Sequence, residues 1–155
     1  MTLPSPFTLA RTALYTGLLA GTLDIGAAIL TNLQVPARVV LQSVASGLLG
    51  PAAFRGGWTT AWLGLAAHFA IMLVIAAIFV AAAAAIPTLR RFWIPVGVAF
   101  GVAVWLAMTF VVVPMSASPL TPPADLTAAL KPIAIHILFV GLPIAWTTRR
   151  ILGRA

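Results

Sequence analysis

The chain has 155 residues, of which 62% are apolar and 7% charged, and nine basic against two acidic side chains give a formal net charge of +7. A water-soluble globule of this size needs more polar surface than that. The composition therefore excludes a soluble domain and predicts an integral membrane protein, and the lack of cysteine excludes disulfides and thiolate metal sites.

Four runs are long enough to cross a membrane, for which a helix needs about 20 mostly apolar residues. The first run is expected to remain as a span, because it is longer than a signal peptide and carries Asp24. The sequence thus predicts an all-α integral membrane four-helix bundle, forming a single transmembrane domain over residues 1–155. The predicted spans are approximately residues 12–30, 58–86, 92–113 and 132–148, with residues 126–130 as an extension of the last.

A shorter helix is predicted between the first two spans, over about residues 36–49. Pro36 suits a first helical position, and Gly50-Pro51 stops the helix. A helix of roughly 14 residues cannot cross the hydrocarbon core, so we expect an amphipathic helix in the interface or a re-entrant one. Its polar stripe comprises Arg38, Gln42 and Ser46, and its apolar face comprises Val40, Leu41, Val44, Leu48 and Leu49.

The basic residues stand at the ends of the apolar runs, a pattern that orients helices in a bilayer and does not indicate nucleic-acid binding. Placing both termini and the 87–91 turn on one side satisfies the positive-inside rule and puts the termini in the cytoplasm. That side holds Arg11, Arg90, Arg91, Arg149, Arg150 and Arg154, against Arg38, Arg55 and Lys131 on the other. The outer connection 114–125 is rich in Pro and Ser, and Asp125 at its end is expected to cap the next helix.

Small residues let helices approach closely in lipid. Two GxxxG motifs offer such faces, Gly17 with Gly21 in the first span and Gly97 with Gly101 in the third. Asp24 continues the first face and is therefore expected to point at a neighbouring helix. Packing within the chain is the first interpretation of both motifs, and homodimerisation is the alternative.

A buried polar layer follows from the predicted depths. At about 1.5 Å per residue, Asp24, Trp105 and His136 all lie roughly 20 Å from the cytoplasmic boundary, and His68 lies within about one turn of them. Met108 is one turn from Trp105. An unpaired carboxylate in hydrocarbon costs about 2.5 to 3.5 kcal/mol on insertion scales, so we expect Asp24 to be protonated or paired with an imidazole.

Several roles for this layer stay open. In the simplest interpretation the pair of Asp24 with a histidine is structural. In a second interpretation Asp24 titrates and handles protons or a small solute. One carboxylate and two imidazoles also suit zinc, iron or manganese, and two histidines could ligate haem, but no local ligand spacing supports either cofactor. No nucleophile motif or phosphate-binding glycine loop occurs, so no catalytic residue is predicted and an enzyme is the less favoured class.

Three stretches resemble one known family: "GLLAGTLDIGAAIL", "VVLQSVASGLLGPAAFRGG" and "AFGVAVWLAMTFVVVPMSA". They are similar to the small, uncharacterised YagU-like proteins of the bacterial inner membrane, over most of the first three spans. The resemblance implies a four-helix protein in the inner membrane of a Gram-negative bacterium. It implies no activity, substrate or catalytic residue.

The sequence therefore predicts a small multi-pass inner-membrane protein that handles protons or a small solute at the Asp24 layer. The first alternative is an accessory subunit that docks on a larger membrane complex, and the second is a haem- or metal-binding membrane protein. The expected partners are the lipid bilayer and either further copies of the chain or that larger complex.

Overall fold

The computed structural model describes residues 4–153, and all the regular structure in that range is helical. Five segments are long and apolar enough to cross a membrane: Pro6–Leu30, Ala37–Arg55, Gly57–Ala85, Trp93–Met115 and Leu126–Leu152. The elements are α1 (Pro6–Leu30), α2 (Ala37–Leu49), the 3-10 helix η1 (Gly50–Arg55), α3 (Gly57–Ala85), α4 (Pro87–Arg91), α5 (Trp93–Ala107), the π-helix η2 (Met108–Val112), α6 (Val113–Met115), α7 (Leu126–Ile135), the π-helix η3 (His136–Gly141) and α8 (Leu142–Leu152).

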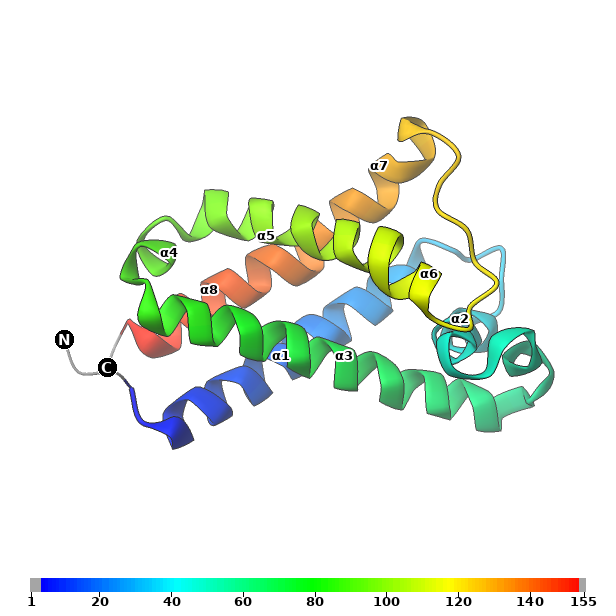
Figure 1. The fold of residues 1–155 in the computed structure, drawn as a ribbon, viewed down its shortest axis with the longest axis horizontal. Helices are drawn as coiled ribbons and strands as arrows, with labels where there is room; N and C mark the ends of the chain where they lie inside the picture. The colour runs from blue at the N-terminus through cyan, green and yellow to red at the C-terminus, as the bar shows by residue number, and fades with distance from the viewer. Residues whose placement is uncertain (1–3, 154–155) are drawn as a thin grey trace.

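The long helices α1, α3, α5 and α8 extend along the molecule, whereas α2 is seen almost end-on at one end (Figure 1). The start of α1, the end of α8 and the α4 turn meet at the opposite end. There Leu9 packs on a buried cluster of Val80, Ala84 and Leu152, and Arg90 Nη1 donates to the Leu152 carbonyl at 2.8 Å. The chain therefore leaves this end in α1, passes α2 at the far end, and returns in α3.

Helix α1 begins earlier than predicted, and the last helical stretch includes the predicted extension 126–130. Helix α1 starts at Pro6 because Ser5 caps it, accepting a bond from the Thr8 amide at 3.2 Å. The last helical stretch runs without a break from Leu126 to Leu152, since Pro132 lies inside α7 and does not begin it. The predicted cap is confirmed: Asp125 Oδ1 accepts from the Ala128 amide at 2.8 Å.

Helix α2 has the predicted bounds, but its polar stripe does not form one exposed surface. Only Arg38 is exposed, whereas Gln42 and Ser46 are buried. Gln42 Nε2 donates to the Gly57 carbonyl at 2.8 Å, and Ser46 shares a 2.9 Å bond with the Ser118 hydroxyl. The stripe faces inward because the start of α3 and the 116–118 connection cover it and present polar groups that need partners.

A second difference lies at the end of α2. Gly50 has a φ of 61°, a left-handed conformation that favours glycine, and it ends α2 as expected. The chain then forms the 3-10 helix η1 instead of a plain loop, so residues 37–55 are two helices joined at Gly50 and not one straight rod.

The last two long segments, Trp93–Met115 and Leu126–Leu152, each contain a wide turn next to a proline. The Val113 amide bonds to the Met108 carbonyl, and the Leu142 amide bonds to the Ile137 carbonyl, both five residues back. Pro114 and Pro143 follow directly. Proline lacks an amide hydrogen and clashes with the carbonyl four residues earlier, and a π turn is one way in which a helix accommodates such an interruption.

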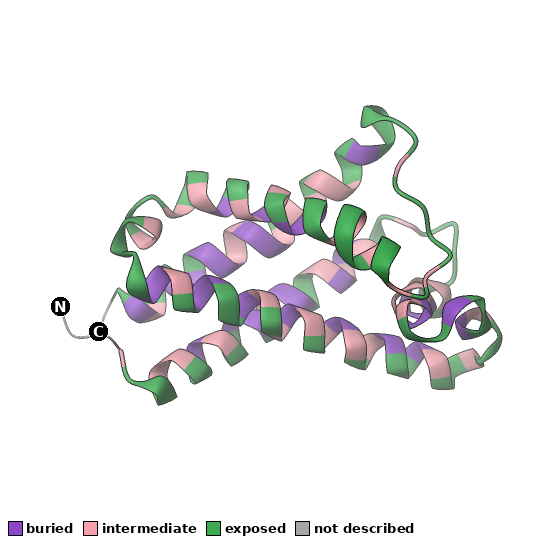
Figure 2. Ribbon diagram, in the orientation of Figure 1, coloured by how far each residue is buried: buried purple, intermediate pink, exposed green. Residues whose placement is uncertain are grey.

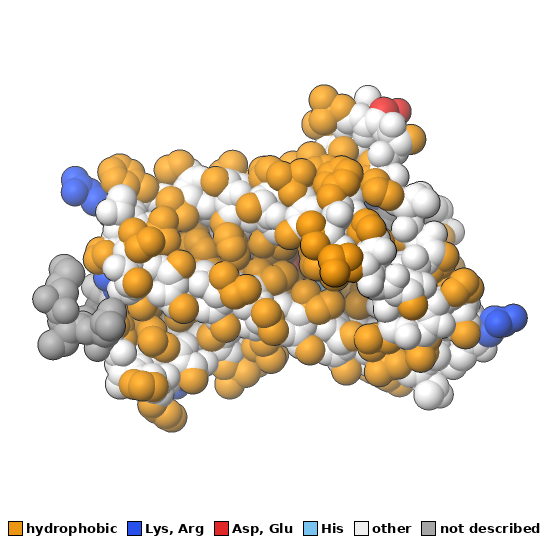
Figure 3. Space-filling view, in the orientation of Figure 1, with side chains coloured by type: hydrophobic (Ala, Val, Ile, Leu, Met, Phe, Trp, Pro, Cys, Tyr) orange, Lys and Arg blue, Asp and Glu red, His pale blue; other side chains and the backbone are white. Residues whose placement is uncertain are grey.

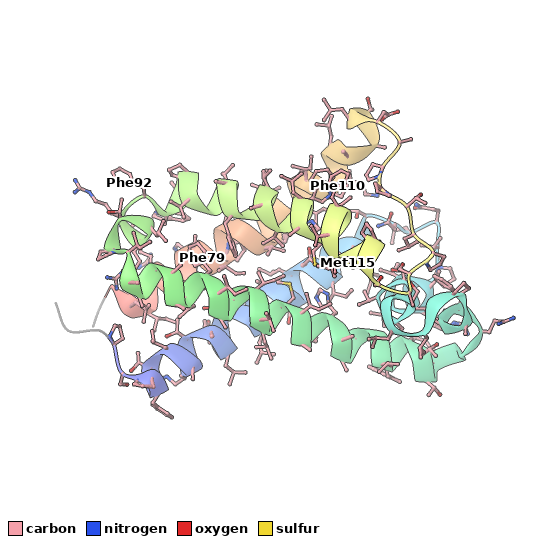
Figure 4. The ribbon with its side chains drawn as sticks, in the orientation of Figure 1. Phe79, Phe92, Phe110 and Met115 are labelled. Atoms are coloured by element: carbon pink, nitrogen blue, oxygen red, sulfur yellow. The ribbon has the colours of Figure 1, made fainter. Side chains whose placement is uncertain are left out.

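The core lies where α1, α3, α5 and α8 face one another, and their outer sides are more exposed (Figure 2). Phe79 of α3 packs against Phe100 of α5, with ring centroids 4.8 Å apart. Figure 4 shows Phe79 in the half of the molecule nearer α4, Phe92 at the α4 end and Met115 near the α2 end. The visible outer surface is mostly hydrophobic, with Lys and Arg side chains at the two ends (Figure 3).

Both GxxxG motifs contact other helices of the same chain. A Cβ atom added to Gly21 would lie 2.9 Å from the Phe69 ring of α3, and one added to Gly17 would lie 3.1 Å from the Leu73 Cα. A Cβ added to Gly101 would lie 2.7 Å from the His136 carbonyl oxygen, and Gly97 lies against the start of α8. The glycines thus permit close approach of α1 to α3 and of α5 to η3.

Candidate functional site

A polar pocket of about 360 Å³ lies between the second half of α1 and helix α7. Its polar lining brings together two residues of the predicted layer, Asp24 and His136, with two that sequence analysis did not select, Asn32 and Lys131. The full lining is Asp24, Ala28, Asn32, Ala128, Lys131, Pro132, Ile135 and His136.

Asp24 is half-buried, and its Oδ1 atom is buried with no hydrogen-bond partner among the residues that the structure describes. The expected direct bond to an imidazole is therefore not formed in this conformation. A buried oxygen without a partner is costly, so the carboxyl group has an unused capacity to bind a proton or a donor.

His136 contributes a second unused acceptor to the pocket. Its Nδ1 atom lies 2.9 Å from the Pro132 carbonyl oxygen. A carbonyl oxygen can only accept, so Nδ1 carries the hydrogen, and Nε2 forms no hydrogen bond with the residues that the structure describes. His136 is also the first residue of the wide turn η3, which fixes the ring between α7 and α8.

His68 lies one helical turn from Asp24 but holds two helices together. Its ring is buried, and its Nε2 atom donates to the Gly21 carbonyl of α1 at 2.9 Å. The ring also meets the edge of Phe69, with centroids 5.5 Å apart. His68 therefore links α3 to α1 below the pocket and does not line it.

Lys131 and Asn32 close the outer side of the pocket. Lys131 Nζ donates to the Thr31 carbonyl at 2.6 Å and to Asn32 Oδ1 at 2.9 Å, and Asn32 Nδ2 donates to the Ala28 carbonyl at 2.7 Å. A lysine at the last carbonyls of a helix also interacts favourably with the helix dipole. These residues are about a hundred positions apart in the sequence, so no local pattern reveals the contact.

Trp105 and Met108 lie outside this pocket. Trp105 is buried and meets Phe110 edge-on, with centroids 5.8 Å apart. Met108 lines a separate apolar groove of about 560 Å³ between α3 and α5, together with Ile71, Ile78 and Phe100. The predicted layer thus divides into a polar pocket beside α1 and an apolar groove on the α3–α5 side.

Buried hydroxyls also lie between α1 and α8, and sequence analysis missed them. Thr147 of α8 donates to Thr16 at 3.1 Å, and Thr12 donates to the Thr8 carbonyl at 2.7 Å. The Thr148 hydroxyl is buried with no partner among the described residues. The available signal was the spacing of four between Thr12 and Thr16.

Residues 4–153 contain no group of three or more His, Asp or Glu side chains arranged to hold a metal ion. The fold and the pocket define an all-helical chain whose long apolar helices suggest a membrane protein. Comparison of the chain with family models, curated proteins and solved structures finds no match. The resemblance to the YagU-like family therefore stays a prediction.

Proposed function

We propose that this is a small multi-pass membrane protein that handles protons, or a small solute coupled to them, at the Asp24 pocket. The observation that carries the proposal is Asp24, which lines a pocket of about 360 Å³ while its buried Oδ1 has no hydrogen-bond partner among the described residues. Ionisable groups inside membrane helices are costly and commonly mark proton or solute pathways.

The chemistry of the pocket supports a proton or a cationic donor as its occupant. The carboxyl group of Asp24 and the free Nε2 of His136 are two acceptors on the same pocket. A shared proton, or the N–H groups of a small amine, would satisfy both of them. Lys131 is exposed at the outer side, so the same pocket has a polar entrance.

The route beyond the pocket is narrow. The Thr16–Thr147 pair lies two turns from Asp24 along α1, and between these levels Ala20, Val140 and Ile144 belong to one buried apolar cluster. We infer that the conformation described is closed on the α4 side, with the Asp24 pocket accessible from the α2 side.

We further propose four membrane spans, formed by α1, α3, α5–α6 and α7–α8, with α2 at the membrane surface. The antiparallel packing of α3 beside α1 supports this count. If α2 also crossed the membrane, α3 would start on the side where α1 starts and would run parallel to α1. The α4 end holds Arg11, Arg90, Arg91, Arg149 and Arg150, which supports cytoplasmic termini, whereas Arg154 lies outside the described residues. The family resemblance supports the bacterial inner membrane.

Proteoliposomes with a trapped pH indicator test the function directly. With an imposed potential, wild type should acidify or alkalinise the lumen faster than empty vesicles, and Asp24→Asn should abolish the difference. Asp125→Asn is the matched control, because it removes the other aspartate but keeps a good helix cap. Proton flux that is absent from wild type, or equal in Asp24→Asn and Asp125→Asn, would refute the proposal.

A further inference from the structure

A second pocket, of about 840 Å³, lies between α1 and α8 at the arginine-rich end of the molecule. Its lining combines two arginines with the hydroxyl groups of one tyrosine and two threonines. The residues are Arg11, Thr12 and Tyr15 from α1, and Trp146, Thr147, Arg150 and Ile151 from α8. The proton-handling proposal uses none of the charged groups in this pocket.

The two guanidinium groups are available to a ligand. Arg11 and Arg150 are exposed, and neither donates a hydrogen bond to another residue in the range 4–153. Arg150 lies over the Trp146 ring at 5.3 Å from its centroid. The chain has two aspartates, Asp24 and Asp125, and both lie toward the other end of the helices, so no aspartate side chain neutralises this pocket.

Other arginines at the same end do not line this pocket. Arg90 donates to the Leu152 carbonyl at 2.8 Å, and Arg149 lies over the Trp93 ring at 6.0 Å from its centroid. Arg11 and Arg150 thus differ from these two because they line one common pocket from two different helices. A single anionic group placed in it can contact both.

The side chains that line the α1–α8 pocket favour a phosphate group as its ligand. Guanidinium binds phosphate oxygens through two parallel hydrogen bonds, and the exposed Tyr15 adds a hydroxyl donor. Thr12 and Thr147 are buried and form a polar floor. Tyrosine and tryptophan are enriched at the depth of lipid headgroups, and basic pockets between membrane helices bind anionic headgroups.

We propose that the α1–α8 pocket binds a phosphate group through Arg11 and Arg150, with Tyr15 and Trp146 beside it. Two sources share this chemistry, the headgroup of an anionic phospholipid and a soluble phosphate ester. The proposal is independent of the Asp24 pocket, which lies about 20 Å away at about 1.5 Å per residue along α1.

The test measures binding to the purified full-length protein by native mass spectrometry and by thermal stability in mild detergent. One arm adds phosphatidylglycerol or phosphatidylcholine, and the other adds inorganic phosphate or glycerol 3-phosphate. The test variant is Arg11→Gln/Arg150→Gln. The matched control is Arg38→Gln/Arg55→Gln, which removes the same charge from the other end of the molecule.

The double variant should weaken phosphatidylglycerol binding by about 25-fold, because each interfacial arginine accounts for about fivefold. The control should bind like wild type, and Arg11→Lys/Arg150→Lys should retain part of the affinity because it keeps the charge. A response in the lipid arm alone identifies a headgroup, and one in the soluble arm identifies a phosphate ester. Equal loss in test and control variants, or no loss in either arm, would overturn the proposal.

Discussion

Gly101→Ala gives a sharp test of the helix packing. A Cβ at this position would lie 2.7 Å from both the His136 carbonyl oxygen and the Ile137 Cα, whereas ordinary contact begins at 3.4 Å. The shortfall is 3.4 minus 2.7, or 0.7 Å, and the contacting atoms are backbone, which cannot rotate away. Overpacking of this kind costs about 1–3 kcal/mol, so helix α5 must separate from η3 or lose stability.

Gly26→Ala is the matched control, since a Cβ at Gly26 would meet nothing within 4 Å. Both changes gain up to about 1 kcal/mol of helix propensity, so the difference between the two variants isolates the packing cost of about 1–3 kcal/mol. Unfolding of each variant in mixed micelles by a denaturing detergent, followed by tryptophan fluorescence, measures this difference. If Gly101→Ala were as stable as Gly26→Ala, the close approach of α5 to η3 would be refuted.

Three further changes test individual hydrogen bonds. Gln42→Leu should destabilise the fold by about 1 kcal/mol because it removes the bonds from Gln42 to the Gly57 carbonyl and the Thr60 hydroxyl, and the same denaturing-detergent titration detects it. A double-mutant cycle with Thr16→Val and Thr147→Val should return a coupling of about 0.6 kcal/mol, typical of interhelical bonds in membranes, and zero coupling would contradict the bond. Asp125→Ala should cost about 1 kcal/mol through its lost cap, whereas Asp125→Asn should not, and a cost shared by both would exclude capping as the cause.

The helical elements could be predicted from the sequence because the apolar runs are long and their ends carry strong signals. Gly50 and Asp125 mark helix boundaries through their own backbone and side-chain chemistry, and both act as expected in the structure. Pro36 lies one residue before the predicted position, as the N-cap of α2 and not as its first helical residue. The start of α1 was placed too late because Arg11 was taken as its boundary, while Ser5 in fact supplies the cap.

The orientation of α2 could not be predicted, because hydrophobic periodicity assumes that a polar stripe faces water. Gln42 and Ser46 face the protein instead, where the Gly57 carbonyl and the Ser118 hydroxyl need partners. These partners are 15 and 72 residues away in the sequence. Leu48 and Leu49 are exposed in the same helix, which suits a helix whose outer side meets lipid.

The site could be predicted in part. Helical rise placed Asp24 and His136 at one depth, and they do share a pocket. Depth alone carries no information about direction around a helix axis, however, so it also grouped Trp105 and Met108 with them, and these two lie elsewhere. The charge of Lys131 assigned it to the end of a span. Its bond to Asn32 joins two residues 99 positions apart in the sequence, and hydrophobic periodicity cannot predict such a contact.

The direction of Asp24 follows from the helix geometry once the neighbours of α1 are known. Gly17 and Gly21 face α3, whereas Thr16 faces α8. At about 100° per residue, Asp24 lies about 60° from Gly21 and about 20° from Gly17 around the helix axis, on the side of Thr16. Asp24 therefore points between α3 and the α7–α8 segment, and the two histidine rings bond instead to the Gly21 and Pro132 carbonyls.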